Sequence, residues 1–95
     1  MNINDLDLNL LRLFDAVYTY KKVSLAADSL GISQPAASQG LSRLRSMFND
    51  SLFVRATGGV KPTPRAERLA TSVRNALDIL NHALTDTDVF EPAHS

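Results

Sequence analysis

The first regular pattern of apolar positions begins near the N-terminus. Apolar residues recur there at intervals of three and four, which places them on one face of an α-helix. These residues are Leu10, Leu13, Phe14, Val17 and Tyr18. Asp7 precedes them, and a carboxylate at that position accepts backbone N–H groups and suits the positive end of the helix dipole. The pattern predicts a first helix capped by Asp7.

A second, shorter helix is predicted within the stretch VSLAADSLGIS. Ser24 is its expected N-cap, and Gly31 offers the left-handed conformation that ends a helix. Ser33 is then the expected N-cap of a third helix, with Pro35 in the first turn, where a missing N–H costs nothing. Two helices joined by so short a turn cross at a steep angle, which is the geometry of a helix-turn-helix.

The third helix is expected to bury a narrow stripe and to leave the rest of its surface free. The stripe consists of Ala37, Leu41, Leu44 and Phe48. After it, the segments LFVR and GVKP are predicted to be strands on either side of Gly58 and Gly59, because a glycine pair is typical of a hairpin tip. An isolated hairpin is marginally stable, so this wing should lean on the helices.

Thr63 and Pro64 predict the start of the longest helix, which we expect over residues 64–84. Its apolar residues form two seams that together are wider than one small domain covers. We expect part of this surface to pack on the first helix and the rest to form a two-fold homodimer. The predicted interface residues are Leu69, Val73, Ala76, Leu77, Leu80 and Leu84. Burial against a further domain is the open alternative.

The predicted fold class is therefore mainly α. Residues 1–63 form a winged helix-turn-helix of three helices and a short two-stranded β wing. Residues 64–84 form a linker and dimerisation helix, and residues 85–95 form a polar tail. The chain of 95 residues is long enough for one small domain and too short for a large enclosed active site.

The net charge of the chain is zero, but the charges are distributed unevenly along it. Ten basic and ten acidic side chains cancel over the whole chain. Residues 21–65, however, carry seven basic and two acidic side chains, a net charge of +5, whereas the segments before and after them are acidic. A positive field is thus expected around the third helix. The chain has no cysteine and no apolar run that spans a bilayer, so we expect a cytoplasmic protein and no membrane partner.

The polar face of the third helix carries serines, glutamines and arginines but no carboxylate. The major groove of DNA is anionic and rich in hydrogen-bonding edges, and glutamine and arginine pair there with adenine and guanine. We expect the recognition helix, residues 34–47, to enter that groove. The candidate residues on it are Gln34, Pro35, Ser38, Gln39, Ser42, Arg43 and Arg45. An ordinary solvated helix face is the alternative.

Further cations flank this helix. Arg55 and Lys61 lie near the hairpin tip, where they are expected to reach phosphates or a minor groove. Lys21, Lys22 and Ser24 precede or begin the second helix, where side chains and a helix N-terminus bind phosphate. Ser24 as a cap alone and the cations as ordinary surface charges are the alternatives. No metal-ligand cluster, phosphate loop or nucleophile elbow is present, and His82 and His94 are isolated, so we expect no enzyme activity and no cofactor or metal.

Four segments in this order resemble the N-terminal module of LysR-type transcriptional regulators: LNLLRLFDAV, SLAADSLGISQPAASQGLSRLR, LFVR and PTPRAERL. The likeness covers about residues 6–84, and RLRSMFNDSLFVR resembles the branch that contains nodulation regulators. It implies contacts with promoter DNA by a wing residue, Arg55, and by the start of the third helix. The residues there are Ser33, Gln34, Pro35, Ala36, Ser38 and Gln39.

The resemblance also implies a dimer with antiparallel linker helices, a tetramer for the full-length protein, and a small-molecule effector bound by a further C-terminal domain. One difference is that many members have arginine where this chain has Gln39, and a bulkier residue where it has Gly40. The sequence thus predicts a regulator that binds double-stranded promoter DNA. A winged-helix module that docks on proteins through the long apolar helix is the second hypothesis, and retention on a DNA or heparin column separates the two. A small hydrolase is the third.

Overall fold

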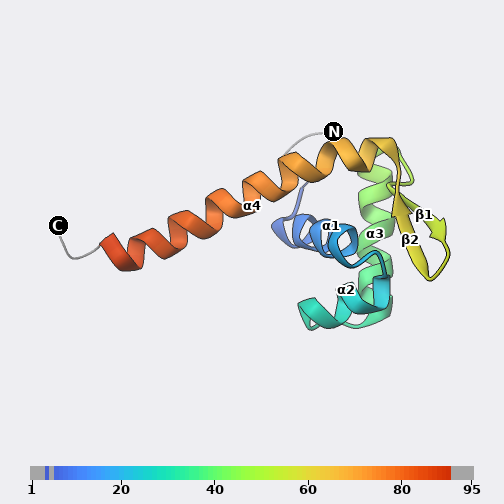
Figure 1. Cartoon of the computed structure of the whole chain (residues 1–95), viewed down its shortest axis with the longest axis horizontal. Coiled ribbons are helices and arrows are strands. Elements are labelled where there is room, and N and C mark those ends of the chain that lie inside the picture. The colour runs from blue at the N-terminus through green and yellow to red at the C-terminus, as the bar shows by residue number, and fades with distance from the viewer. Residues whose placement is uncertain (1–3, 5, 91–95) are drawn as a thin grey trace.

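A computed structural model gives the structure of residue 4 and residues 6–90, with side chains up to residue 85. The elements follow in the order α1 (Leu8–Tyr20), α2 (Val23–Leu30), α3 (Gln34–Phe48), β1 (Phe53–Ala56), β2 (Gly59–Pro62) and α4 (Pro64–Phe90). Figure 1 shows α1, α2 and α3 as a compact head with the hairpin on one side, while α4 crosses the head and extends far beyond it. The predicted winged helix-turn-helix with a long C-terminal helix is confirmed.

The helix ends follow local chemistry. Asp7 caps α1, since its Oδ1 accepts a 2.8 Å hydrogen bond from the N–H of Asn9. Ser33 caps α3 by accepting from the N–H of Ala36 at 3.2 Å, and Pro35 lies in the first turn. Gly31 ends α2 with a φ of 70°, in the left-handed region. These three sequence predictions are confirmed.

The predicted cap of α2 is wrong. The helix begins at Val23, so Ser24 lies inside its first turn, and Lys22 occupies the N-cap position without a side-chain cap bond. The reason is the abrupt end of α1, where Lys21 adopts a left-handed φ of 56°. This turn directs the chain straight into α2, whose first backbone bond runs from the N–H of Ala26 to the carbonyl of Lys22.

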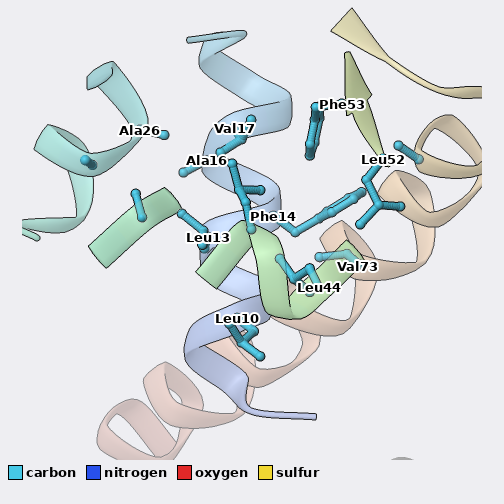
Figure 2. Packing of buried hydrophobic residues seen from close by; sticks show 14 residues of the cluster. Leu10, Leu13, Phe14, Ala16, Val17, Ala26, Leu44, Leu52, Phe53 and Val73 are labelled. Carbon is cyan, nitrogen blue, oxygen red and sulfur yellow. The ribbon is translucent and has the colours of Figure 1, made fainter. Parts of the chain in front are cut away.

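The core lies between the three helices of the head, the hairpin and the first half of α4 (Figure 2). Phe14 is at its centre, with its ring 5.3 Å from that of Phe53. The predicted stripe of α3 is confirmed for Ala37, Leu41 and Leu44, whereas Phe48 is only half-buried. The Phe48 ring lies under the guanidinium of Arg65 instead, 5.7 Å away.

Gly40 also faces the core, at a position where a side chain does not fit. A Cβ at this position would lie 2.5 Å from Cδ2 of Leu13. The glycine therefore permits α1 and α3 to pack closely, which offsets the weaker helix propensity that glycine brings.

The predicted strand GVKP is confirmed as β2, whereas β1 begins and ends one residue later than the predicted LFVR, which makes the turn tighter. β1 and β2 pair antiparallel with Ala56 opposite Gly59, so Thr57 and Gly58 are the two turn residues. Gly58 has a φ of 76°, whereas Gly59 belongs to the strand. Gly59 is needed for another reason: a Cβ there would lie 2.1 Å from the carbonyl oxygen of Lys21. The N–H of Val60 donates to the same oxygen at 2.9 Å, which docks the wing on the loop between α1 and α2.

The long helix begins as predicted and ends later than predicted. Thr63 is its cap, since Thr63 Oγ1 accepts from the N–H of Ala66 at 3.2 Å. The helix continues through residues 85–90, which the sequence prediction assigned to a polar tail. No glycine or proline interrupts residues 65–90, so nothing in that segment breaks the helix. The rest of the predicted tail, including His94, lies outside the described residues.

Candidate nucleic-acid interface

The outward face of α3 is free of contacts with the core. Gln34 and Ser38, which the sequence placed on one strip, are both exposed, and the other candidates of the helix start are exposed with them. These are Ser33, Pro35, Ala36 and Gln39. No aspartate or glutamate occurs between residues 29 and 49, so the face presents only neutral and cationic groups.

An open groove of about 480 Å³ gathers candidates from three separate elements. It lies between the start of α2, α3 and the wing, whose strand backbone at Ala56, Gly59 and Val60 forms one wall. Its polar lining consists of Lys22, Ser24, Gln34, Arg45 and Arg55. None of the described residues that line it is acidic, and three of them are cations, so the groove favours an anionic ligand.

Arg45 is held in this groove by the backbone. It is half-buried, and its Nε donates a 3.0 Å hydrogen bond to the carbonyl of Ser51. Because a guanidinium has five N–H donors, this bond orients the side chain and leaves further donors for a ligand.

Three candidates lie elsewhere. In the hairpin register Lys61 pairs with Val54 and Arg55 pairs with Val60, so Arg55 and Lys61 project from opposite faces of the wing. Ser42 and Arg43 line a different concave surface on α3, together with Asn4. Only Arg55 of the two wing cations therefore joins the groove.

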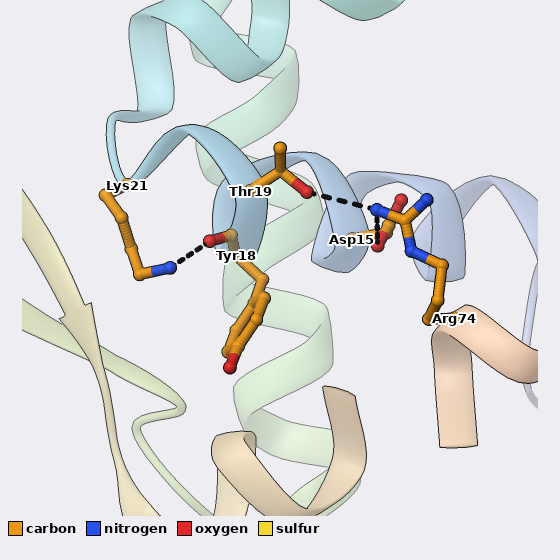
Figure 3. Close-up of polar contacts among 5 residues, drawn as sticks. All are labelled: Asp15, Tyr18, Thr19, Lys21 and Arg74. Atoms are coloured by element: carbon orange, nitrogen blue, oxygen red, sulfur yellow. Dashed lines mark hydrogen bonds and ion pairs between the residues drawn. The ribbon is translucent and has the colours of Figure 1, made fainter. Parts of the chain in front are cut away.

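Lys21, unlike Lys22, does not line the groove. Its ammonium donates to the carbonyl of Tyr18 and lies 4.1 Å from the centre of the Tyr18 ring (Figure 3). The side chain thus folds back on α1 and stabilises the left-handed turn that follows the helix.

The structure also contains a polar cluster that the sequence did not reveal. Asp50 Oδ2 accepts hydrogen bonds of 2.8 Å from the N–H of Leu52 and from Oγ1 of Thr63. The N–H of Thr63 donates to the carbonyl of Leu52 at 2.8 Å. These bonds join the end of α3 to the wing and to the start of α4, and they hold Leu52 in a left-handed conformation with a φ of 61°. The bond between Asp50 and Thr63 has no local signal in the sequence, because the two residues are 13 positions apart.

The hydrogen bonds to the carboxylate of Asp50 make the free energy of unfolding depend on pH. The backbone N–H of Leu52 and, next, the hydroxyl of Thr63 stabilise the carboxylate and hold the pKa of Asp50 below its ordinary value of 3.8. A lowered folded-state pKa contributes stability that is complete above the ordinary value and is lost as the pH falls through the folded-state pKa. We expect urea unfolding to show a steeper loss of stability below pH 3.8 in the parent than in Asp50→Asn. Parallel curves for the two proteins would contradict this assignment.

The predicted dimer residues divide into two groups. Val73 is buried within the chain, and Leu69 and Leu77 pack against the same core, so these three serve the contact between α4 and α1. Ala76 is half-buried. Leu80 and Leu84 are 45% and 70% exposed.

A further exposed apolar side chain accompanies these two. Ile79, which lies outside the predicted seams, is 68% exposed. Among the described side chains of α4, the exposed large apolar ones are thus Ile79, Leu80 and Leu84. Leu80 and Leu84 also line a groove of about 530 Å³ with residues of α1 and the end of α2.

Two further features are absent from the described part of the chain. No group of three or more histidine, aspartate or glutamate side chains there is arranged to bind a metal. No helix among the described residues is both long enough and apolar enough to cross a bilayer.

The adjacent helices α2 and α3, the wing and the cationic groove define a winged helix-turn-helix domain of the DNA-binding class. The chain belongs to the LysR family: residues 8–67 match the family model described as "Bacterial regulatory helix-turn-helix protein, lysR family".

Curated relatives support the same family. The chain is 44% identical over all of its 95 residues to the HTH-type transcriptional activator NahR of Pseudomonas putida, and covers 32% of that protein. It is 47% identical over 95 residues to Nodulation protein D 1 of Rhizobium leguminosarum bv. phaseoli, and covers 30% of it. The likeness to nodulation regulators is confirmed, and the chain spans about a third of the length of these relatives.

Solved structures agree with the fold. The structure titled "probable transcriptional regulator PA0477 from Pseudomonas aeruginosa" superposes with a TM-score of 0.86 at 44% identity, over 98% of this chain and 31% of that one. The structure titled "BenM_DBD/catB site 1 DNA Complex" superposes with a TM-score of 0.84 at 27% identity, over 94% of this chain and all of that one.

Proposed function

We propose that this domain binds double-stranded promoter DNA in a sequence-specific manner and regulates transcription. The observation that carries the proposal is the exposed, carboxylate-free face of α3 beside a groove whose three cations come from the N-cap of α2, from α3 and from β1. Membership of a family of bacterial regulators and similarity to a domain crystallised with DNA support it.

We assign base contacts to the exposed start of α3, which enters the major groove. Gln34 and Gln39 pair with adenine edges, Ser38 donates or accepts at a base or phosphate, and the apolar groups of Pro35 and Ala36 contact thymine methyls. Ser33 reaches a phosphate while it caps the helix.

Phosphate contacts are assigned to the flanking groups, which position the helix and supply most of the affinity. They comprise Lys22, Ser24, Ser42, Arg43, Arg45, Arg55 and Lys61. Arg45 lines the same groove as Gln34, where its bond to the carbonyl of Ser51 orients the guanidinium for a phosphate or a guanine.

The active form in this proposal is a homodimer through α4, and the full-length protein is a tetramer. Exposed Leu80 and Leu84, with Ile79 beside them, support an apolar contact between two copies. Two-fold symmetry then matches a DNA site with two half-sites. A small-molecule effector acts through a further domain, and the domain itself is a regulator of the cytoplasm without enzyme activity.

A protein-docking module through the same apolar residues is the second candidate. The exposed side chains of Ile79, Leu80 and Leu84 are its only specific support, and the family does not favour it.

The test compares two single substitutions on a panel of duplexes that differ at one base pair each. Gln34→Ala is expected to lose about 1–3 kcal/mol of binding free energy at one base position and to relax specificity there. Lys61→Ala is expected to weaken binding to all duplexes alike, since a phosphate contact reads no sequence. Identical profiles for the two variants would refute these roles, and no binding to any duplex would refute the function.

A further inference from the structure

Two polar contacts fasten α4 to α1, and both lie on the exposed side of the packed surfaces. The hydroxyl of Tyr18 donates to Oε1 of Glu67 at 2.6 Å. One turn along α1 and two turns along α4, Arg74 pairs with Oδ1 of Asp15 at 3.1 Å and with Oγ1 of Thr19 at 3.4 Å (Figure 3). The contacts of Glu67 and Arg74 are seven residues apart, which is about 10 Å along a helix axis.

The apolar contact between these helices is narrow. Ala66 and Val73 are the buried side chains of α4 among those described, and Leu69, Ala70 and Leu77 pack against them at the edge. Ridge-into-groove packing sets the angle between two helices with a scatter of about 15–20°, so this narrow patch alone does not fix the direction of α4 closely. Hydrogen bonds depend on direction as well as distance, and two of them at separate points along one helix restrict rotation about the patch.

A small rotation there has a large effect farther along. The 13 residues that follow Leu77, up to Phe90, extend α4 by about 20 Å at roughly 1.5 Å per residue beyond its last core contact among the described side chains. A rotation of about 10° moves the far end by about 3.5 Å, which is close to the rise of one base pair in DNA.

We propose that Glu67 and Arg74, with their partners Tyr18 and Asp15, are positioning residues that fix the direction of α4 relative to the recognition helix and so set the half-site spacing that the dimer accepts. This inference rests on the proposed function, because spacing has meaning only for two DNA-reading heads joined through α4. These residues contact no base. By fixing the direction of α4, they determine the distance between half-sites at which both winged helix-turn-helix units of the dimer bind at once.

The experiment measures the affinity of the chain for a series of duplexes in which the distance between two half-sites changes in steps of one base pair. The parent is expected to prefer one spacing and to lose at least about tenfold in affinity one step away, because the mismatch must be met by deforming the DNA. The double variant Glu67→Ala, Arg74→Ala is expected to accept neighbouring spacings within about threefold of the best one.

Matched variants separate positioning from a general structural role. Glu67→Gln keeps an oxygen that accepts from Tyr18, and Arg74→Lys keeps the positive charge. The double variant Glu67→Gln, Arg74→Lys is therefore expected to prefer the same half-site spacing as the parent. Ser72→Ala, at an exposed position on the same helix, should behave like the parent. A uniform loss of affinity in the double alanine variant, with the preferred spacing as sharp as before, would overturn the inference. A parent that binds duplex DNA without any spacing preference would also overturn it and leave the proposed function standing, whereas a parent that binds no duplex would refute the function itself.

A second measurement applies even where the double variant binds DNA too weakly. The chain has no cysteine, so spin labels can be placed on Ser46→Cys in α3 and Asn81→Cys in α4, both exposed positions. Labelled chains are diluted in unlabelled ones, so that only the distance between the two labels of one chain is measured. The distribution of this distance is expected to be narrow in the parent and broad in the double alanine variant. Equal widths would contradict the positioning role.

Discussion

Raising the salt concentration from 50 to 200 mM is expected to weaken DNA binding by about 10³- to 10⁵-fold, because each phosphate contact releases condensed counterions. Each chain offers five candidate cations to the backbone, and a dimer offers twice as many, so six to ten contacts per dimer is the expected range. The five are Lys22, Arg43, Arg45, Arg55 and Lys61. Fluorescence anisotropy over a salt series gives the slope of log K against log salt directly.

The individual cations provide the control for this experiment. Lys61→Ala should lower the magnitude of the slope by about 0.9 for each chain that contacts a phosphate through this side chain. A slope near zero for the parent would show that the cationic groove does not bind the DNA backbone.

Gly59→Ala is expected to be the most damaging single substitution in the wing. The new Cβ would lie 2.1 Å from the carbonyl oxygen and 3.2 Å from the carbonyl carbon of Lys21, and backbone atoms cannot rotate away as a side chain can. The wing must shift and lose the bond from the N–H of Val60 to Lys21, at a cost of about 3 kcal/mol, the upper end for overpacking. Since Arg55 moves with the wing, DNA affinity should fall together with stability.

Urea unfolding and DNA titration of the same protein check both effects. Gly58→Asn is the matched control, because Gly58 faces open space and asparagine tolerates its left-handed φ of 76°. Gly59→Ala with the stability of the parent would contradict the docking of the wing on Lys21.

The helices of the head could be predicted because their signals are local. The spacing of Leu10, Phe14 and Val17, and the caps Asp7 and Ser33, act within one or two turns of the chain. The predicted start of α2 is wrong because the left-handed Lys21 has no signature in the sequence: glycine, asparagine and aspartate favour that conformation, and lysine does not. The end of α4 was misplaced because polar residues continue a helix as well as they form a tail.

Contacts between distant segments could not be predicted. Asp50 meets Thr63 across the whole wing, and Gly59 meets Lys21 across 38 residues. Both depend on how the hairpin docks, and neither the spacing nor the composition of these segments contains that geometry.

The candidate site was predictable in its residue types and not in its grouping. The absence of carboxylates singled out α3, and Gln34 and Ser38 are exposed as that prediction requires. The strand register decides that Arg55 joins the groove and Lys61 does not. Helical spacing also placed Val73 on a seam for another chain, whereas α1 covers it here.

The most direct test of the central claim is a selection of bound sequences from random duplex DNA by the parent chain. The account predicts enrichment of a motif with two half-sites related by two-fold symmetry, each contacted by one α3, and loss of information at one position per half-site for Gln34→Ala. Recovery of no common motif, or the same motif at full strength with Gln34→Ala, would contradict it.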